Sequence, residues 1–361
     1  MAKTILIGSP WKFSELWNQA LQTLPERPLQ KRDYIYASEL NLSFIDRYLK
    51  MHAIKMSNPP NARSLRKFSA GHVFEWIVGL VLTMVGLLKQ QQLKGEVQLP
   101  GLLRVSGRLD FIAGGAIDWE KAKAEIKRIQ DLFSVSVGDM PPIIFHAIQH
   151  ILSSMEKEFK NNPLKEVVLE CKSVSSFMSE KIEKTKEPMP HHVLQCGHYL
   201  LANKLDEASL VYVCKDDLIS HQFQIFNDKN LLKAYRADIK QMTDYYNASN
   251  HSNPLKTLPP KEPTILFEEG TWRFTKNFKV EYSSYLEMLY GFESPEDFRL
   301  RYQSTVASWN RVFKRIVRGD NITAANKIII AEVEKVLPLD KYVQLAKKDG
   351  AFQKPEENEE E

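Results

Sequence analysis

The sequence predicts an α/β fold: a mixed central sheet flanked by helices, followed by a mostly helical C-terminal region. Runs with the helical spacing of apolar residues alternate with short, strand-like runs rich in Val, Ile and Phe. The chain has 361 residues, 43% of them hydrophobic, which is enough to bury a sizeable core. Strand-like runs are confined to the first part of the chain, and the pattern after it is mostly helical.

The first part of the chain is expected to be helical. Residues 1–60 are interpreted as peripheral helices, with Ser38 as the N-cap of a helix over 39–52. A second helix is expected over 70–91. Its segment 73–88 is apolar all round but shorter than the roughly 20 residues that a membrane span needs. A buried core helix is therefore favoured.

The middle of the chain combines strands with an inserted helical pair. Two runs, 95–99 and 103–113, are separated by a Pro-Gly pair that indicates a hairpin. Residues 118–162 return to a helical pattern and are interpreted as a helical insertion. The elements expected after it are strand 166–174, helices 176–184 and 191–204, strands 208–214 and 219–226, and a helix over 228–246.

A proline-rich segment is expected to divide the chain. Four prolines stand within residues 252–263, which disfavours any packed element there. The expected organisation is a first domain over 1–250, a linker over 251–263, a mostly helical C-terminal region over 264–346 and an acidic, disordered tail over 347–361.

The C-terminal region contains one basic amphipathic pattern, SWNRVFKRIVRGDN. Its cations, Arg311, Lys314, Arg315 and Arg318, recur around a helix together with apolar residues. The pattern is compatible with contacts to a phosphate backbone. It is equally compatible with an ordinary surface helix docked on the first domain.

Composition narrows the class of protein. Lys and Arg number 49 against 45 Asp and Glu, and the net charge of +4 is compatible with a polyanionic partner without requiring one. The three cysteines are single and widely spaced, which argues against a zinc ribbon or a four-cysteine iron–sulfur cluster. The first residues lack the apolar core and cleavage site of a secretory signal. A cytoplasmic protein without membrane contact is expected.

Three acidic residues and one lysine form the candidate catalytic centre. In VVLECKSV, strand alternation sends Glu170 and Lys172 to the same face. Asp110 stands in an apolar run, where burying a carboxylate is costly unless a cation or hydrogen bonds compensate. With Glu75 on the preceding helix, these carboxylates are the hard oxygen ligands that Mg²⁺ or Mn²⁺ prefers. A bound metal ion would activate a water for phosphodiester hydrolysis, and Lys172 would orient that water or stabilise the transition state.

Each of these residues also has an ordinary structural interpretation. Asp110 is compatible with a turn or an ion pair, and Glu170 with Lys172 is compatible with a salt bridge on an exposed strand. Gln195 and Tyr199 are four residues apart and share one face of the expected helix. Alone, they are compatible with a polar helix face and a half-buried tyrosine.

Taken in order, these motifs resemble those of the PD-(D/E)XK nucleases, especially the RecB-like and lambda-exonuclease-like phage branches. The resemblance covers roughly residues 38–227 and implies a restriction-endonuclease-like core with the element order αβββαβ. It implies Mg²⁺-dependent hydrolysis of DNA, with Mn²⁺ as a substitute. The four motifs are Arg66-x4-Gly71-x3-Glu75, Gly107-Arg108-Leu109-Asp110, Glu170-Cys171-Lys172 and Gln195-x3-Tyr199.

The resemblance also implies a role for each motif residue. Asp110, Glu170 and the backbone carbonyl of Cys171 would be metal ligands. Glu75 would be a third carboxylate ligand, directly or through water, and Lys172 the catalytic lysine. Gln195 and Tyr199 would close the active site and touch the DNA backbone, with Gln195 also holding Lys172 or the attacking water. Arg66 would contact a phosphate.

Two features depart from the family pattern. Leu42 and Ser43 stand where some RecB-like nucleases carry a cluster-binding cysteine, so no iron–sulfur cluster is expected. The 59 residues between Asp110 and Glu170 exceed the short hairpin usual in the family, so the helical insertion would have to loop out of the sheet.

The expected function is therefore that of a metal-dependent deoxyribonuclease, an exonuclease acting in recombination, repair or phage DNA processing. DNA is the expected partner, and a recombination or replication protein is a further candidate partner for the C-terminal region. One alternative is a noncatalytic DNA-binding or assembly protein on the same scaffold. Another is a structure- or site-specific endonuclease whose insertion or C-terminal region reads base edges.

Overall fold

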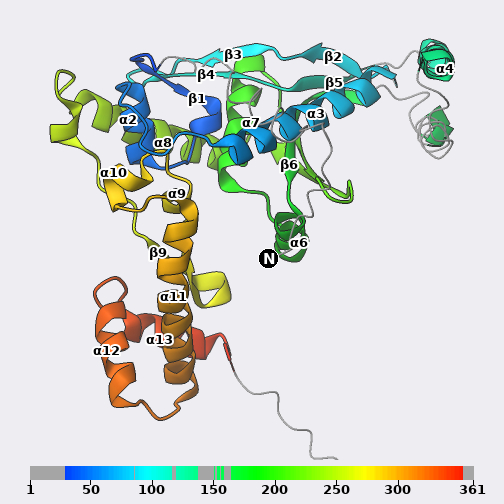
Figure 1. Ribbon diagram of the computed structural model, residues 1–361. Helices are drawn as coiled ribbons and strands as arrows, with labels where there is room; N and C mark the ends of the chain where they lie inside the picture. Colours follow the sequence, from blue (N-terminus) through cyan, green and yellow to red (C-terminus); the bar gives the residue numbers. More distant parts are fainter. Residues whose placement is uncertain are drawn as a thin grey trace, which may run out of the picture. The chain divides into compact units, whose positions relative to one another are not determined.

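A computed structural model describes residues 29–84, 86–115, 119–136 and 164–352, together with residues 150, 153–154 and 156–157. Within these residues the chain is a mixed α/β protein with a mixed sheet flanked by helices and a helical C-terminal region (Figure 1). It divides into two compact units. The first contains the described residues within 1–42, 50–53 and 60–257, and the second those within 43–49, 54–59 and 258–361.

The central sheet of the first unit has five strands in the order β2-β5-β6-β7-β8. The β6–β7 pairing is parallel, and the other pairings are antiparallel. Parallel neighbours require a crossover, which here runs through helices α6 (Ser176–Thr185) and α7 (Pro190–Asn203). The strands are β2 (Leu88–Gln91), β5 (Phe111–Gly115), β6 (Leu164–Val174), β7 (Glu207–Cys214) and β8 (Ser220–Phe226).

A second, smaller sheet shows that the expected strand 103–113 is wrong as a single element. β1 (Tyr34–Tyr36), β4 (Arg104–Arg108) and β3 (Lys94–Val97) form this sheet in the order β1-β4-β3, whereas β5 belongs to the central sheet. The chain bends at Leu109 and Asp110, whose backbone groups bond to the turn between β2 and β3. Leu109 N donates to Leu93 O, and Gln92 N donates to Asp110 O, each at 3.0 Å.

The buried core helix expected over 70–91 is also wrong in its bounds and in its burial, since the helix begins at Ala62 and its Trp76 is 63% exposed. Helix α3 (Ala62–Met84) ends before Gly86, and residues 88–91 form β2 instead. Gly86 has a φ of 75°, Gly86 N donates to Thr83 O, and Leu87 N donates to Leu82 O at 2.9 Å. This is the hydrogen-bond pattern of a helix that ends at a glycine. It turns the chain out of α3 and into β2.

The helix expected over 39–52 begins later than predicted. Ser38 lies inside a short 3-10 helix, η1 (Ala37–Glu39). Helix α2 (Phe44–Met51) starts five residues after the end of η1. The preceding strand β1 pairs in parallel with β4 and has Ile35 fully buried, so this segment is part of the core. The part of the expected N-terminal helices before residue 29 lies outside the described residues.

Helix α7 is buried along most of its length between the first unit's other elements. His198 is fully buried, with Nε2 bonded to Gly95 O at 3.2 Å and Nδ1 to the hydroxyl of Tyr235 at 3.0 Å. Tyr235 belongs to α8 (Lys229–Asn247). Burial lowers the pKa of His198 to about 4, so the ring is neutral and structural. It fixes α7 against β3 and α8.

The insertion expected over 118–162 is described in part. Helix α4 (Trp119–Ser136) is followed by helical residues at 150, 153–154 and 156–157. Lys123 on α4 forms an ion pair with Glu156 at 3.0 Å, which joins the two helical segments. The other residues of the insertion lie outside the described part of the chain.

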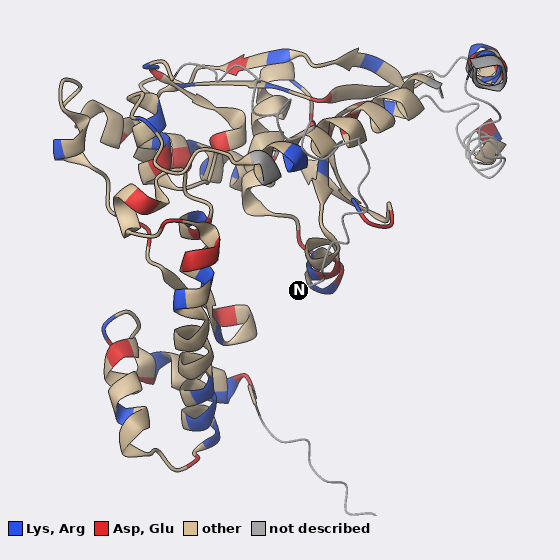
Figure 2. Cartoon of the chain, viewed as in Figure 1, with Lys and Arg blue, Asp and Glu red and all other residues tan. Residues whose placement is uncertain are grey.

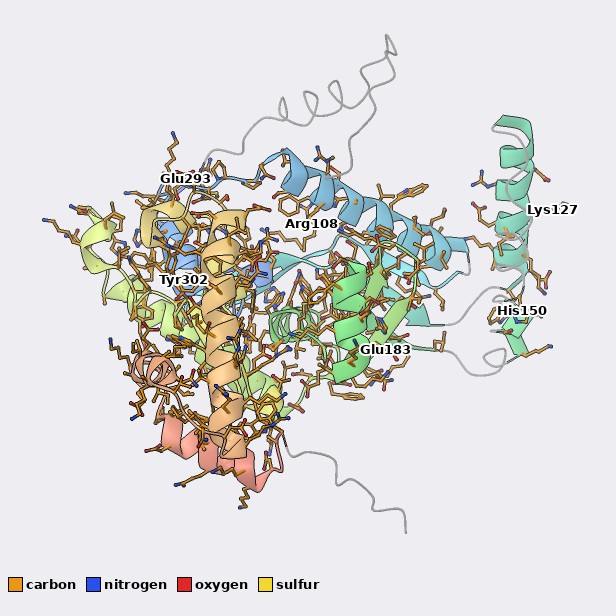
Figure 3. The ribbon with its side chains drawn as sticks, turned by 60° about the horizontal axis from the view of Figure 1, so that its bottom comes forward. Arg108, Lys127, His150, Glu183, Glu293 and Tyr302 are labelled. Carbon is orange, nitrogen blue, oxygen red and sulfur yellow. The ribbon has the colours of Figure 1, made fainter. Side chains whose placement is uncertain are left out.

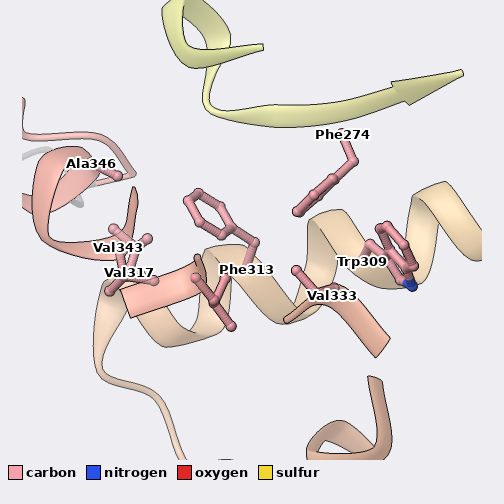
Figure 4. Packing of buried hydrophobic residues seen from close by; sticks show 8 residues of the cluster. Phe274, Trp309, Phe313, Val317, Val333, Val343 and Ala346 are labelled. Carbon is pink, nitrogen blue, oxygen red and sulfur yellow. The ribbon is translucent and has the colours of Figure 1, made fainter. Parts of the chain in front are cut away.

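The second unit consists of a two-stranded hairpin and helices. Its hydrophobic core joins the hairpin to three helices through Phe274, Phe313, Val333 and Val343 (Figure 4). Besides residues 44–49 of α2, the elements are β9 (Ile265–Glu268), β10 (Arg273–Lys276), α9 (Phe278–Glu281), α10 (Leu286–Tyr290), α11 (Pro295–Arg318), α12 (Ala324–Val333) and α13 (Leu339–Lys348).

Both boundary segments of the second unit contain local structure. The expected linker 251–263 includes a short 3-10 helix, η2 (Pro254–Thr257), with Pro254 buried. The expected tail begins inside α13, because Lys347 and Lys348 are helical, and the chain is described as far as Phe352. Residues 353–361 of the tail lie outside the described residues.

Early residues of the chain belong to this second unit through hydrogen bonds. Asp46 Oδ2 accepts from Ser284 N at 2.8 Å, and Asn58 Oδ1 accepts from Glu287 N at 2.7 Å. Within the described part of the chain, no helix combines the length and the apolar character needed to cross a lipid bilayer.

Candidate active site

Asp110 lies at the bend between β4 and β5, directly beside β6. Its Oδ2 accepts a hydrogen bond from Cys171 N at 2.9 Å, and its side chain is 9% exposed. The antiparallel β5–β6 pairing sets this position, because Phe111 is opposite Leu169 in the register. The bend thus delivers one carboxylate to the middle of the central sheet.

Glu170 and Lys172 form an ion pair on one face of β6, as the alternation of the strand predicts. The side chain of Glu170 is 0% exposed, and that of Lys172 is 24% exposed. One carboxylate oxygen of Glu170, Oε1, bonds to Lys172 Nζ. The other, Oε2, is buried and has no hydrogen-bond partner among the described residues. A buried carboxylate oxygen without a partner is costly, so this atom is poised for an additional ligand.

The site contains more carboxyl groups than ammonium groups, and burial changes their pKa values. Burial, followed by the charge of Glu170, raises the pKa of Asp110 to about 8. Burial also raises the pKa of Glu170, even though Lys172 opposes that shift. Burial alone would lower the pKa of Lys172, but the charges of Glu170 and Asp110 outweigh it and raise that pKa, so the lysine stays charged.

Glu75 on α3 faces the same cluster. Its Oε1 accepts a hydrogen bond from Gln92 Nε2, and its Oε2 lies 3.6 Å from Nδ1 of the exposed His72. After burial and the nearer charges, Glu75 contributes to the raised pKa values of both Asp110 and Glu170. The helix therefore supplies a third carboxylate close enough to influence the other two.

Gln92 is a site residue that the sequence analysis missed. It lies in the turn between β2 and β3 with a φ of 55°. Its backbone N–H bonds to Asp110 O at 3.0 Å, and its side chain donates to Glu75. One turn residue thus connects the carboxylate of Glu75 with the backbone of Asp110. Nothing in the local sequence QQQLKG distinguishes this glutamine from its neighbours.

Gln195 and Tyr199 form a hydrogen-bonded chain that ends on the backbone near Asp110. Gln195 Nε2 donates to the hydroxyl of Tyr199 at 3.0 Å, and that hydroxyl donates to Arg108 O at 2.9 Å. Arg108 is the last residue of β4 and is labelled in Figure 3. A Cβ at Gly107 would lie 2.9 Å from the tyrosine ring, so glycine permits this close approach. The hydrogen bond of Gln195 goes to Tyr199, whereas the expectation was Lys172 or a water.

Arg66 is placed apart from these residues. It is exposed on α3, nine residues before Glu75. At about 100° per residue, nine residues amount to about two and a half turns. Arg66 therefore lies on the opposite side of the helix from Glu75.

Comparisons with known proteins find distant structural likenesses. A solved structure described as the crystal structure of SSO0001 matches with a TM-score of 0.35 and 16% identity, over 64% of this chain and 84% of that one. An alkaline exonuclease (LHK-Exo) from Laribacter hongkongensis matches with a TM-score of 0.30 and 12% identity, over 65% of this chain and 93% of that one. No family model and no curated protein matches the sequence. Likenesses at these TM-scores do not establish a shared function.

The donor atoms of the site suit a hard cation with few protein ligands. As the side chains stand, no three His, Cys, Asp or Glu residues in the described part of the chain are grouped to hold a metal ion. Asp110 and Glu170 remain as a pair of buried carboxylates, with one oxygen, Glu170 Oε2, lacking a partner among the described residues. Mg²⁺ commonly takes one or two carboxylates and completes its shell with water and substrate oxygens.

Proposed function

We propose that this chain is a metal-dependent deoxyribonuclease with a restriction-endonuclease-like core. The observation that carries the proposal is the buried group of Asp110, Glu170 and Lys172, in which Glu170 Oε2 lacks a partner among the described residues. Burying such charges reduces stability unless a further ligand compensates. Because Glu170 is fully buried, the group is more consistent with a site that binds a cation than with an ordinary surface salt bridge.

The proposed metal ligands are Asp110, Glu170 and the backbone carbonyl of Cys171, with Glu75 acting through water. Mg²⁺, or Mn²⁺ in its place, would supply a bound water of lowered pKa and would neutralise charge on the scissile phosphate. Glu75 fits the water-mediated role because its oxygens already face Gln92 and His72. No iron–sulfur cluster is part of the proposal.

Lys172 is proposed as the catalytic lysine. Its raised pKa keeps the ammonium charged, so it can donate hydrogen bonds to the attacking water or to a phosphate oxygen as negative charge develops there. Its partner Glu170 holds the ammonium close enough to Asp110 for the charge of Asp110 to raise the pKa of the lysine. Burial of both carboxylates excludes bulk water and strengthens these electrostatic interactions.

Gln195 and Tyr199 are proposed to act mainly by positioning. Their hydrogen bonds end on the carbonyl of Arg108, two residues before Asp110, and so hold the bend that presents the carboxylate. Both residues are buried, so the proposed contact with the DNA backbone would require substrate to reach this part of α7. Arg66 remains a proposed phosphate contact only for DNA that extends around α3.

Within this class we propose an exonuclease that acts on DNA ends in recombination, repair or phage DNA processing, in the cytoplasm of a bacterial or phage-infected cell. This proposal is supported by the resemblance of the sequence motifs to those of the exonuclease branch. The motifs are Glu75, Asp110, Glu170-x-Lys172 and Gln195-x3-Tyr199. A recombination or replication protein is proposed as a partner of the C-terminal region.

The test is digestion of end-labelled linear duplex, single-stranded and closed circular DNA with Mg²⁺, with Mn²⁺ and with a chelator. We expect cleavage only with a divalent cation and only on DNA that has ends. Lys172→Met should lower the rate at least about 100-fold. The matched control is Lys165→Met on the same strand, whose side chain is 61% exposed, and it should cleave normally.

Folding must be separated from chemistry in this test, because removing Lys172 leaves Glu170 buried without its cation. Circular dichroism and DNA binding in chelator serve as folding checks, and Asp110→Asn provides a second inactive variant with nearly unchanged shape. Cleavage that persists in chelator, or in both folded variants, contradicts the proposed site. Cleavage of circular DNA contradicts the exonuclease assignment alone.

A further inference from the structure

Four cations line one face of α11 in the second unit. Arg311, Lys314, Arg315 and Arg318 follow one another at spacings of three, one and three residues, which places them along one side of a helix over about 10 Å. We call these four residues the basic stripe. Arg311, Lys314 and Arg318 are exposed, and Arg315 is half-buried.

The basic stripe is not neutralised by carboxylates of the described residues. None of its four cations forms an ion pair within that part of the chain, whereas Arg299, near the start of the same helix, pairs with Glu281 and Glu296. An unneutralised row of cations produces a strong positive potential and attracts polyanions. The stripe therefore differs from an ordinary surface helix, whose charges are commonly mixed.

The opposite face of α11 holds the basic stripe in place. Trp309, Phe313 and Val317 are buried in the core of the unit, and Val317 shares that core with Val343 and Ala346 of α13 (Figure 4). A helix that binds a membrane surface inserts its apolar face into the lipid. Here that face is already covered by protein, so the stripe is better suited to a soluble polyanion than to a bilayer.

Helix α13 extends the positive surface. It packs on α11 through the shared core and ends in the exposed Lys347 and Lys348. Figure 2 shows the blue of the last turns of α11 beside the blue end of this short helix. The rigid, extended row of charge matches the repeating phosphates of a nucleic acid, whose binding is dominated by such contacts.

The acidic end of the sequence starts at the same place. Arg318 Nε donates to Phe352 O at 3.0 Å, and Lys314 Nζ lies 5.7 Å from the centre of the Phe352 ring. The nine residues 353–361 that follow contain five Glu and one Lys. Nine residues can extend to roughly 30 Å, about three times the length of the stripe. Their carboxylates can therefore reach each of its cations.

We propose that the basic stripe binds the phosphate backbone of a nucleic acid and that the glutamates of residues 356–361 compete with it for the same cations. The inference goes beyond the proposed nuclease function, since it concerns only the second unit and requires no cleavage. The tail acts as an internal polyanion that weakens nonspecific binding, because each of its contacts must be exchanged for a phosphate contact.

The first experiment measures binding of the full-length protein to a fluorescently labelled 30-base-pair duplex, in chelator, over a range of salt concentrations. Arg311→Glu/Lys314→Glu removes two cations of the stripe and leaves Arg318 in place. Loss of two phosphate contacts lowers the salt slope by about 1.8 and weakens binding on the order of 60-fold at 0.1 M salt. The matched control is Lys327→Glu/Lys335→Glu, which has the same charge change at two other exposed lysines of this unit.

The second experiment tests the competition. Changing the tail glutamates to Gln should tighten DNA binding of the otherwise unaltered chain at low salt, and it should give little gain in the Arg311→Glu/Lys314→Glu background. The glutamates to be changed are Glu356, Glu357, Glu359, Glu360 and Glu361.

The outcomes separate the two parts of the inference from each other and from the nuclease proposal. Equal binding by the stripe variant and its control overturns the stripe as a nucleic-acid site. An equal gain from the tail change in both backgrounds overturns the competition. Loss of cleavage in Lys172→Met with these binding differences intact leaves the inference standing.

Discussion

Replacing Asp110 by Asn should stabilise the metal-free protein, and the gain should increase with pH. Burial and the neighbouring charge of Glu170 raise the pKa of Asp110 to about 8 in the folded protein. In an unfolded chain the same carboxyl group has a pKa of about 3.9. The unfolded chain therefore releases this proton near pH 4, and the folded protein holds it until near pH 8.

The sign and size of the effect follow from this difference. Between the two pKa values the folded state binds one more proton than the unfolded state, so the free energy of unfolding falls as pH rises. The decrease is about 1.4 kcal/mol for each pH unit. From pH 5 to pH 8 the free energy of unfolding of the unaltered protein should therefore fall by about 4 kcal/mol. The Asp110→Asn variant should not show this fall, because an amide does not titrate.

Metal should act in the opposite direction, since a cation favours the ionised carboxylate. Mg²⁺ at 100 times its dissociation constant would stabilise the unaltered protein by about 2.7 kcal/mol. The Asn variant, lacking the charge, should gain much less.

The assay is urea denaturation followed by circular dichroism, in chelator and in Mg²⁺, from pH 5 to pH 8. Asp206→Asn is the matched control, because it makes the same chemical change at a side chain that is 83% exposed. A stability difference between Asp110→Asn and the unaltered protein that stays constant with pH would refute the reasoning. Equal stabilisation of both proteins by Mg²⁺ would refute the assignment of Asp110 as a ligand.

Three further predictions concern the residues that hold the site. Gln92→Leu removes the donor to Glu75 but keeps the backbone bond to Asp110 O, so cleavage should fall about tenfold, the equivalent of one hydrogen bond, with an unchanged denaturation curve. Gly107→Ala places a Cβ 2.6 Å from Ala37 Cβ and 2.9 Å from the Tyr199 ring and should lower the free energy of unfolding by about 1–3 kcal/mol in urea denaturation. Tyr199→Phe leaves the carbonyl it bonded without its donor and should cost about 1–2 kcal/mol in the same assay, along with lower cleavage.

Strand β6 illustrates what the sequence alone could predict. The alternation in VVLECKSV placed Glu170 and Lys172 on one face, and their ion pair confirms it. That prediction succeeds because the period of two is a local property of any regular strand. The alternation of side chains gives a wrong prediction only where the backbone departs from a regular strand.

The bend before β5 is such a place. The sequence pattern of residues 103–113 predicts one apolar strand. In the structure these residues form β4 and the start of β5, which belong to different sheets. The bend depends on distant partners, since Leu109 bonds to Leu93 and the carbonyl of Arg108 accepts from Tyr199. A local pattern contains no information about these contacts, and for the same reason Gln92 could not be identified.

The arrangement of charges gives the strongest reason to expect a divalent cation. When all are ionised, the carboxylates of Glu75, Asp110 and Glu170 and the ammonium of Lys172 leave two negative charges uncompensated. The protein holds Asp110 and the bend before it through the backbone N–H groups of Gln92 and Cys171 and the hydroxyl of Tyr199. A structural salt bridge would need only Glu170 and Lys172, and the added carboxylates make folding less favourable. One divalent cation would neutralise the excess, which explains why a stable fold would retain a buried group that is unfavourable without it.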